Sequence, residues 1–462
     1  MIVNHRQVVL SCGWIACLTL AACNAPAADS ADWPCFRGPT GQGTSSERGL
    51  PVEWSGQDNI AWKIELPGAG TSTPIVVGDR IYLTCYSGFN VPGASSSNMQ
   101  NLKRHLVCLD RGTGQIHWTK DIAAKLPEQD NIRDEHGYAS NTLAADGQRL
   151  YAFFGKTGAM AFDFEGKKLW EADVGDGLHG WGTASSPVLH GDLVFINASV
   201  ESESLVALDK ASGKEKWRAE GIKESWNTPI LVEAGGRTEL VVAIQGKILS
   251  FDPPTGKPLW TCDTDIGWYM VPSLVSHQGI VYCVGGRSGG ALAVRAGGKG
   301  DVTGSHRVWT GKKGSNVTSP VLHDGHVYWM HEQSGIAYCA DLKSGDIVYE
   351  ERVPGAGQIY ASPVLVDGKI YQVSREGKTF VIAAQPQFKL LAENDFEERG
   401  AYNSGFAVSQ GQLLLRNDKH LYCIGKSASS GQKAGSKKSV SAKPAAKKPT
   451  TKKPKKKRGT DE

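Results

Sequence analysis

The sequence lacks the cysteine patterns that are typical of metal and redox sites. Its ten cysteines include no adjacent pair and no Cys-x-x-Cys spacing, so the usual spacing of zinc ligands is absent and we expect no metal site. Beyond the N-terminus the chain also lacks an apolar run long enough to cross a membrane. Its composition excludes a collagen, a coiled coil and a wholly disordered chain.

Glycine, in contrast, is abundant. The 462 residues include 55 glycines, about 12%, against a usual level of about 7%. Such an excess indicates many turns and therefore many short strands, which disfavours a mostly helical enzyme. The length suggests about three ordinary domains or one large repetitive domain.

The N-terminus has the features of a secretory signal peptide, which we place at residues 1–23. A basic pair precedes an apolar run over residues 8–22, which is too short for a comfortable membrane span. The run ends in Leu20-Ala-Ala-Cys23, which resembles a bacterial lipobox, and this predicts lipidation of Cys23. Ordinary cleavage after Ala27 is the alternative. Both routes predict an extracytoplasmic protein, either lipid-anchored in the periplasm or secreted, with a lead segment over residues 24–53.

The near-neutral charge of +4 hides two oppositely charged parts. Residues 426–462 carry 13 basic and 2 acidic residues, a net charge of +11, which leaves 38 basic and 45 acidic residues, a net −7, for the rest. The Lys-rich tail has little apolar surface to bury and is predicted to be disordered. Its partner would be a polyanionic envelope polymer, an anionic membrane surface or nucleic acid. A solvated tail without a partner is the alternative.

Comparison of the sequence with itself reveals a repeat. A small or polar residue, then Pro or an equivalent, an apolar strand, a Gly turn and a second strand recur in eight copies. Most copies are 42–47 residues apart, and they start at Thr71, Ser140, Ala184, Trp226, Met270, Val317, Tyr360 and Tyr402. A unit of about four short strands and ~40–45 residues is typical of a propeller blade.

A second pattern, Asp-x-x-Ser/Thr-Gly followed by Trp, recurs after several copies. In the stretch from Asp110 to Trp118, Asp and Gly supply the chemistry of a tight hairpin. The tryptophan ends up on the outer strand, where we expect its ring to pack between neighbouring sheets. The repeat tryptophans are Trp62, Trp118, Trp170, Trp217, Trp260 and Trp309.

The last copy predicts how the ring closes. It ends near Gly425 without a fourth strand, whereas an unassigned strand over residues 59–66, with Trp62 in the repeat position, precedes the first copy. We therefore predict an all-β, eight-bladed β-propeller over residues 54–425, monomeric and closed by its N-terminal strand. An open ring would leave exposed sheet edges.

The Asp-x-x-Thr-Gly-x-x-x-Trp repeat resembles that of PQQ-like β-propellers. The opening Asp32-Trp-Pro-Cys-Phe-Arg-Gly-Pro39 is similar to the start of propellers in the same group. The group includes quinoprotein alcohol dehydrogenases and the non-catalytic lipoprotein of outer-membrane β-barrel assembly. The resemblance implies that a quinoprotein would need adjacent cysteines, a tryptophan and a Glu/Asn/Asp calcium site. Since this sequence has no adjacent cysteines and no motif matching that triad, we expect no cofactor, with PQQ and calcium as the alternative.

The mature sequence holds seven cysteines besides Cys23. Cys108, Cys339 and Cys423 occupy one repeat position, where other copies have a small residue, and are expected to be small core residues. An odd number leaves at least one thiol unpaired. One candidate disulfide joins Cys35 to Cys423.

The loops that lead into the inner strands should gather at one mouth of the central channel; we call them the mouth loops. Most copies contribute an aromatic residue and nearby polar groups, the combination expected of a binding site. Packing of these aromatics against neighbouring blades is the alternative. The candidate ligand-binding residues are Arg133, Glu135, His136, Tyr138, His179, Trp181, Glu224, Trp226, Tyr269, Asn316, Gln358, Tyr360, Arg399 and Tyr402. No catalytic residue is predicted.

These features favour a non-catalytic propeller outside the cytoplasm. It would serve as an interaction platform for an envelope protein or polymer, in a role such as outer-membrane protein assembly. A quinoprotein dehydrogenase and a glycan-binding propeller are the alternatives.

Overall fold

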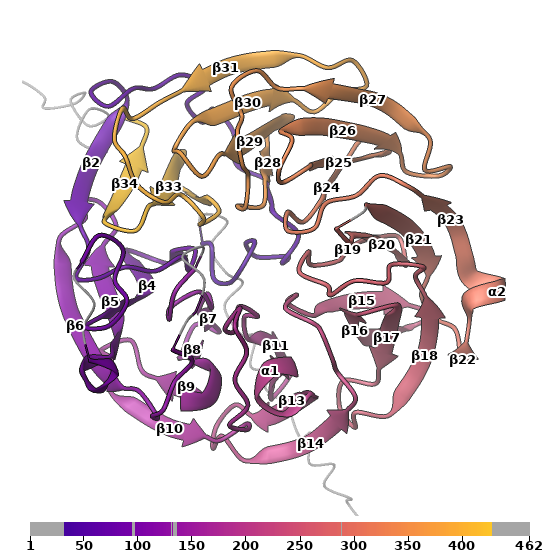
Figure 1. The fold of residues 1–462 in the computed structure, drawn as a ribbon, viewed down its shortest axis with the longest axis horizontal. Coiled ribbons are helices and arrows are strands. Elements are labelled where there is room, and N and C mark those ends of the chain that lie inside the picture. Colours follow the sequence, from indigo (N-terminus) through magenta and orange to yellow (C-terminus); the bar gives the residue numbers. More distant parts are fainter. Residues whose placement is uncertain (1–31, 95–97, 131, 133–135, 288, 427–462) are drawn as a thin grey trace, which may run out of the picture. The chain divides into compact units, whose positions relative to one another are not determined.

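The computed structural model describes residues 32–94, 98–130, 132, 136–287 and 289–426. Strands within these residues form eight sheets arranged in a ring (Figure 1). The predicted all-β, eight-bladed propeller is therefore confirmed. The predicted signal peptide, the lipidation site Cys23 and the Lys-rich tail beyond Lys426 lie outside the described residues.

Each blade is a meander whose strands follow one another from the channel to the rim. The first four blades are β3 (Ile75–Val77), β4 (Arg80–Ser87), β5 (Lys103–Asp110) and β6 (Ile116–Ala123); β7 (Ala144–Ala145), β8 (Leu150–Phe153), β9 (Ala159–Phe162) and β10 (Lys168–Ala172); β11 (Val188–His190), β12 (Leu193–Ala198), β13 (Ser204–Asp209) and β14 (Glu215–Glu220); and β15 (Ile230–Ala234), β16 (Arg237–Ile244), β17 (Lys247–Phe251) and β18 (Pro258–Asp263).

The other four blades continue the pattern around the ring. They are β19 (Val275–His277), β20 (Ile280–Gly285), β21 (Gly290–Arg295) and β23 (Arg307–Gly311); β24 (Val321–His323), β25 (His326–Met330), β26 (Ile336–Asp341) and β27 (Ile347–Arg352); β28 (Val364–Val366), β29 (Lys369–Val373), β30 (Thr379–Ala383) and β31 (Leu390–Asn394); and β32 (Ala407–Ser409), β33 (Gln412–Arg416), β34 (His420–Ile424) and β2 (Ile60–Glu65).

Short elements decorate this ring. Strand β1 (Thr44–Ser45) adds to β28 in parallel, and β22 (Gly300–Asp301) adds to β18. The helical elements are α1 (Ser199–Ser202), α2 (Thr303–His306) and two 3₁₀ turns, Met99–Asn101 and Gly155–Thr157. None of the helices in the described part of the chain is long and apolar enough to span a membrane.

The N-terminal strand closes the ring, as the sequence predicts. Strand β2 pairs antiparallel with β34, with Trp62 opposite Cys423 and Ile64 opposite Leu421. Backbone bonds extend the pairing at both ends, from Gly425 N to Asn59 O at 2.7 Å and from Leu66 N to Lys419 O at 2.7 Å. The eighth blade is thus built from both ends of the propeller.

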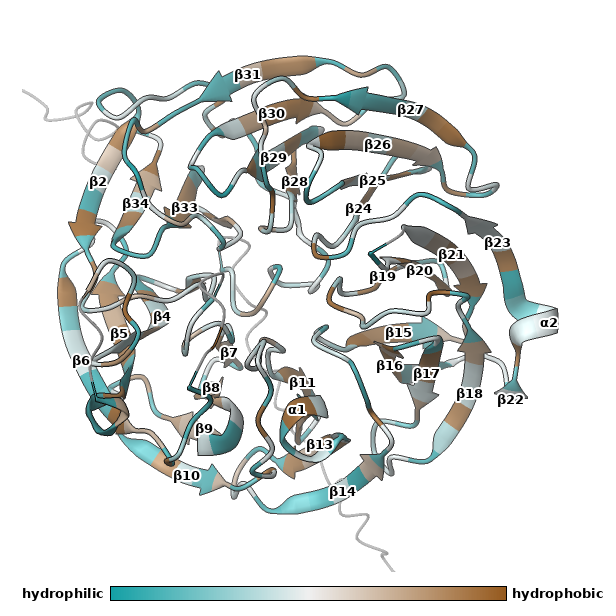
Figure 2. Cartoon of the chain, in the orientation of Figure 1, coloured by the Kyte–Doolittle hydropathy of each residue, from teal (hydrophilic) through white to brown (hydrophobic). Residues whose placement is uncertain are grey.

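Apolar clusters between adjacent blades form the core. Tyr82 and Cys108 of the first blade share one cluster with Leu150 and Phe162 of the second. The outermost strands are more polar, and Figure 2 shows hydrophilic residues along β14 where the more central β26 is mainly hydrophobic. Each blade is consequently stabilised by its two neighbours.

Most repeat tryptophans lie against the hairpin of the next blade. The Trp217 indole covers Gly256, where an added Cβ would come within 2.5 Å of the ring and φ is +69°. Glycine is required at this position for both reasons. The indole Nε1 then donates to Pro253 O at 2.9 Å. Equivalent ring-to-glycine contacts join Trp62 to Gly114, Trp118 to Gly166, Trp170 to Gly213 and Trp309 to Gly345.

Trp260 departs from this arrangement because the next blade lacks the Asp-x-x-Thr-Gly turn. Its indole is buried, and Nε1 donates to Glu239 Oε2 at 2.5 Å. Glu239 is fully buried and also accepts from Ser250 Oγ at 3.1 Å and pairs with Arg237 at 2.8 Å. A buried carboxylate of the same blade therefore takes the place of the next blade's hairpin carbonyl as the acceptor of the indole N–H.

The candidate disulfide between Cys35 and Cys423 is wrong. All seven cysteines of the described residues are free thiols. Cys423 lies in the eighth-blade sheet opposite Trp62, 3.6 Å from Arg111 Nη1. Cys35 lies in the lead segment, where its Sγ contacts Gly38 O at 2.9 Å. Cys108, Cys339 and Cys423 are all buried, in agreement with their expected role as core residues.

Candidate functional site: a blind pocket in the central channel

The lead segment closes one end of the channel. Trp33 pairs with Val76, and Pro34 O accepts from Ala145 N at 2.9 Å, where the inner strands of the first two blades end. Across the ring, Gln42 Oε1 accepts from Ser276 N at 2.8 Å, and β1 joins the inner strand of the seventh blade. The segment therefore spans the channel at the end away from the mouth loops.

Phe36 and Arg37, at the middle of this crossing, form the floor of a pocket. The cavity above them has a volume of about 260 Å³, and its walls come from the mouth loops and inner strands of all eight blades. Gly38 follows with φ +80°, and a Cβ there would come within 2.7 Å of the Trp33 ring. Only glycine lets the chain turn here beneath that indole. Among the described residues, the lead segment thus covers the end of the channel away from the mouth loops.

Arg37 is a buried cation without an acidic partner among the described residues. It is 4% exposed, and its Nη2 donates to the carbonyls of Gln42, at 2.9 Å, and Pro320. Its Nε and Nη1 have no hydrogen-bond partner. Burial lowers the pKa of the guanidinium to about 9, which leaves it charged at neutral pH. A charge in such surroundings is costly unless a counter-charge approaches it.

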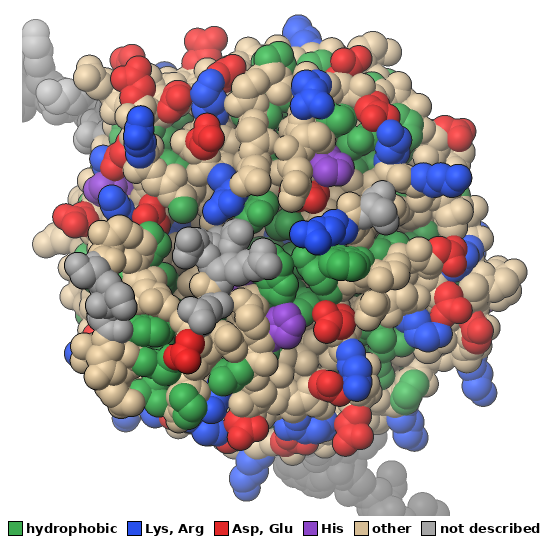
Figure 3. Space-filling model, viewed as in Figure 1, with side chains coloured by type: hydrophobic (Ala, Val, Ile, Leu, Met, Phe, Trp, Pro, Cys, Tyr) green, Lys and Arg blue, Asp and Glu red, His purple; other side chains and the backbone are tan. Residues whose placement is uncertain are grey.

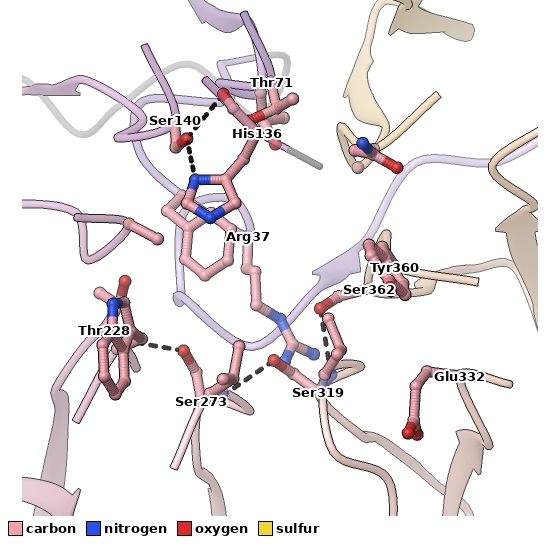
Figure 4. Close-up of a pocket in the computed structure, with 18 of the residues that line it drawn as sticks. Arg37, Thr71, His136, Ser140, Thr228, Ser273, Ser319, Glu332, Tyr360 and Ser362 are labelled. Atoms are coloured by element: carbon pink, nitrogen blue, oxygen red, sulfur yellow. Dashed lines mark hydrogen bonds between the residues drawn. The ribbon is translucent and has the colours of Figure 1, made fainter. Parts of the chain in front are cut away.

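A chain of hydroxyl groups surrounds the pocket. In each of six successive pairs of blades, a Ser or Thr hydroxyl accepts the backbone N–H of the equivalent residue in the preceding blade, at 2.9–3.1 Å. The chain stops at the eighth blade, where Gly405 occupies the repeat position. Figure 4 shows Arg37 reaching toward the Ser319 and Ser362 part of this chain. The residues joined are Thr73, Thr142, Ser186, Thr228, Ser273, Ser319 and Ser362.

Aromatic side chains form part of the wall near the opening. The Trp226 and Tyr269 rings meet edge to face at 5.6 Å, and Trp181 lies 6.1 Å from Tyr269. Trp226 Nε1 donates to Gly182 O at 2.8 Å, and Asn316 Nδ2 donates to the Tyr269 hydroxyl at 3.2 Å. These contacts hold the rings in place before any ligand arrives. Figure 3 shows apolar side chains gathered in the hollowed centre of this face.

Two further titratable groups line the pocket. Burial lowers the pKa of His136 to about 4, so its imidazole is neutral at pH 7, with Nδ1 3.0 Å from Ser140 Oγ. Glu332 is buried, and its Oε2 accepts from Asn316 N at 2.9 Å and from Ser315 Oγ at 3.2 Å. The Glu332 carboxylate, which follows β25, is therefore bonded to the loop that leads into β24, and it makes no ion pair with Arg37.

The structure brings part of the predicted set of site residues to this pocket. His136, Trp181, Trp226, Tyr269, Asn316 and Tyr360 line it. Gln358 and Arg399 instead line a separate shallow depression, in which Gln358 accepts from Arg375 at 3.0 Å. Arg133 and Glu135 lie outside the described residues.

The other predicted residues do not line the pocket, for reasons of packing. Tyr402 is fully buried and stacks near Phe396. Tyr138 packs on Tyr86, and its hydroxyl donates to Gln129 O at 2.6 Å. His179 packs its ring against Trp226 at 4.9 Å and lines a smaller neighbouring cavity. Glu224 contributes its carbonyl, which accepts from Met270 N at 2.9 Å.

Sequence reasoning missed the floor and the chain of hydroxyls. The signal for Phe36 and Arg37 was the opening Trp-Pro-Cys-Phe-Arg-Gly-Pro motif, to which no role was given. The signal for the hydroxyls was the Ser or Thr that recurs at one position of the repeat, next to the Pro of copies such as Ser319-Pro320.

Comparison with known proteins identifies the family. The family model described as outer membrane protein assembly factor BamB matches residues 102–351 and 235–434. The chain belongs to this family. The resemblance to PQQ-like propellers is thereby confirmed, and the BamB family is one of extracytoplasmic propellers.

Solved structures support the fold alone, because their sequence identities are low. BamB from Moraxella catarrhalis is similar at a TM-score of 0.53, with 14% identity, over 79% of this chain and 99% of that one. The quinohemoprotein alcohol dehydrogenase from Comamonas testosteroni is similar at 0.58, with 12% identity, over 88% and 82%. A europium-containing methanol dehydrogenase is similar at 0.60, with 11% identity, over 86% and 98%.

One characterised relative matches a limited part of the sequence. A polyvinylalcohol dehydrogenase from Pseudomonas sp is 26% identical over an alignment of 178 residues, and the match covers 34% of this chain and 24% of that protein. The chain thus matches about a quarter of that relative's length.

The pocket of this BamB-family propeller does not fit PQQ with calcium. Calcium takes six to eight oxygen ligands, usually with several carboxylates. Among the described lining residues only Glu332 carries a carboxylate, and its Oε2 is already engaged. Within the same described ranges no cluster of three His, Cys, Asp or Glu residues could hold a metal. The sequence also lacks adjacent cysteines.

Proposed function

We propose that this BamB-family propeller is a non-catalytic binding platform outside the cytoplasm. It captures an envelope protein or polymer at the open mouth of its channel, in a role such as outer-membrane protein assembly. The observation that carries the proposal is the pocket itself, whose described residues form aromatic walls packed against one another and a floor from the lead segment. Aromatic side chains with a few polar groups among them are typical of a pocket that recognises a ligand.

A pull-down from envelope extract, with the purified protein and matched variants as bait, tests the proposal. Trp181→Ala with Tyr360→Ala removes two wall residues that are partly exposed, whereas Ile347→Ala removes an exposed side chain from the rim. We expect the first variant to lose the captured material and the rim variant to retain it. A chain that ends at Lys426 separates capture by the pocket from capture by the Lys-rich tail.

Two outcomes would contradict the platform. Equal capture by both variants would show that the mouth is not the binding surface. Dye-linked alcohol oxidation after reconstitution with PQQ and calcium would establish a dehydrogenase. Protease treatment of the extract distinguishes a protein partner, whose capture it abolishes, from a polymer such as a glycan, whose capture survives.

A further inference from the structure

We propose that the floor of the pocket is an anion site, in which Arg37 binds the carboxylate of a ligand about the size of one ring. This inference names the ligand chemistry of the same mouth and rests on the proposed function. It is carried by the Arg37 guanidinium, the hydroxyl groups beside it and the size of the cavity.

The guanidinium has hydrogen-bond donors that no described residue uses. Arg37 is more than nine-tenths buried, lines the cavity, and leaves Nε and Nη1 without a hydrogen-bond partner. Figure 4 shows its side chain extending from the lead segment to the hydroxyl groups of the seventh and sixth blades. Among the described residues no carboxylate forms an ion pair with it. An anionic ligand would supply the missing charge, and hydrogen bonds between ions are about twice as strong as neutral ones.

The neighbouring hydroxyls add donors to the same site. Ser273, Ser319 and Ser362 each accept one backbone N–H. A hydroxyl that accepts one bond still has a proton to donate, and none of these three donates to another group in the described part of the chain. The floor therefore presents hydrogen-bond donors and a positive charge, which suit a carboxylate and disfavour a cation.

The walls and the volume limit the rest of the ligand. The cavity of about 260 Å³ falls below the ~300–1,000 Å³ of pockets that hold drug-sized molecules. Trp181, Tyr269 and Tyr360 offer ring faces and edges above the floor. A single flat or chair-shaped ring with one carboxylate fits these limits, either as a free aromatic acid or as an acidic sugar unit.

Calorimetric titration of the whole purified protein tests the site. The probes are benzoate and glucuronate, each with a neutral counterpart, benzamide and glucose. We expect at least one acid to bind saturably, and at least about tenfold more tightly than its counterpart, because one charge-assisted bond is at stake. The acid that binds distinguishes an aromatic acid from an acidic sugar.

Variants assign the binding to Arg37. Arg37→Gln should weaken the acid at least about tenfold, whereas Arg399→Gln, in the separate depression, should leave the affinity unchanged. Ser362→Ala keeps the charge and removes one floor hydroxyl, and it should weaken the acid severalfold. The Ser362→Ala variant keeps the proposal testable if Arg37→Gln does not fold.

Several outcomes would overturn the anion site. The first is equal affinity for the acid and its neutral counterpart. The second is unchanged affinity for the acid in a folded Arg37→Gln protein. If the Tm of that variant is also lower, Arg37 is a structural residue. If neither acid binds while envelope capture still depends on Trp181 and Tyr360, the anion site is refuted and the platform stands.

Discussion

Truncation from the N-terminus separates the two roles of the first segment, closing the ring and closing the channel. We compare the whole chain with chains that begin at Ser46 and at Pro67. The first truncation removes the floor and β1 but keeps β2, whereas the second also removes β2. We expect the chain from Ser46 to fold without its floor, and the chain from Pro67 not to fold stably.

The burial of side chains sets the size of this difference. Leu50, Trp54 and Leu66 are each 6% exposed, and all three are lost only in the longer truncation. At about 1.5–3 kcal/mol for each large buried side chain, their loss costs about 5–9 kcal/mol. Removal of β2 also leaves β34 as an open edge. The total approaches the ~5–15 kcal/mol by which a typical domain is stable.

The shorter truncation costs less. Its main buried loss is Trp33, which is 1% exposed, at about 3–5 kcal/mol by analogy with core Trp→Ala changes. Far-UV circular dichroism, urea unfolding and limited proteolysis of the three chains measure the outcome. A cooperative transition in the chain from Pro67, at the same urea concentration as in the whole chain, would refute the closure argument.

Three further changes test single contacts. Trp260→Phe removes a donor from the buried Glu239 carboxylate and should lower the free energy of unfolding in urea by about 1–3 kcal/mol; an unchanged midpoint would contradict this. Burial raises the pKa of Glu201 to about 8, so the folded state holds its proton more tightly than the unfolded state, and stability should fall as pH rises from about 4.5 to 8. Glu201→Gln should remove that fall, as thermal melts across this pH range would show, and a parallel decline in the variant would argue against it. Gly405→Ser should supply the hydroxyl that the eighth blade lacks and should keep or raise the Tm, because an added Cβ would make only ordinary contacts of 3.5 Å or more. A Tm below that of the wild type would refute this prediction.

The periodic part of the architecture could be predicted from the sequence, because each blade repeats the same physical solution. The hairpin from Asp110 to Trp118 encodes a turn and a wedge, and the strand around Trp62 completes the last copy. Where a copy loses the pattern, the prediction weakens. Trp260 has no standard turn to pack against, and nothing in the repeat pointed to Glu239 as its partner.

The site was predicted less completely, because an aromatic residue in a mouth loop can serve either packing or binding. Tyr402 and Tyr138 packed into the core, whereas Tyr269 and Tyr360 line the pocket. The choice depends on neighbours in other blades, which local spacing does not encode. Arg37 comes from a segment outside the repeat, so its position below the channel emerges only when the chain crosses the ring.

The floor also predicts a conflict between stability and binding at position 37. An unpaired buried cation is costly, and replacement of buried charges by apolar groups of similar size is often neutral or stabilising. We therefore expect Arg37→Met to match or exceed the wild type in Tm when no ligand is present, even though its two carbonyl partners lose a donor. Added acid at ~100 times its Kd should then stabilise the wild type by about 2.7 kcal/mol and leave the variant unchanged. An equal shift in both proteins would mean that the acid binds elsewhere, and a large drop in the Tm of the variant would mean that Arg37 is retained to hold the lead segment across the channel.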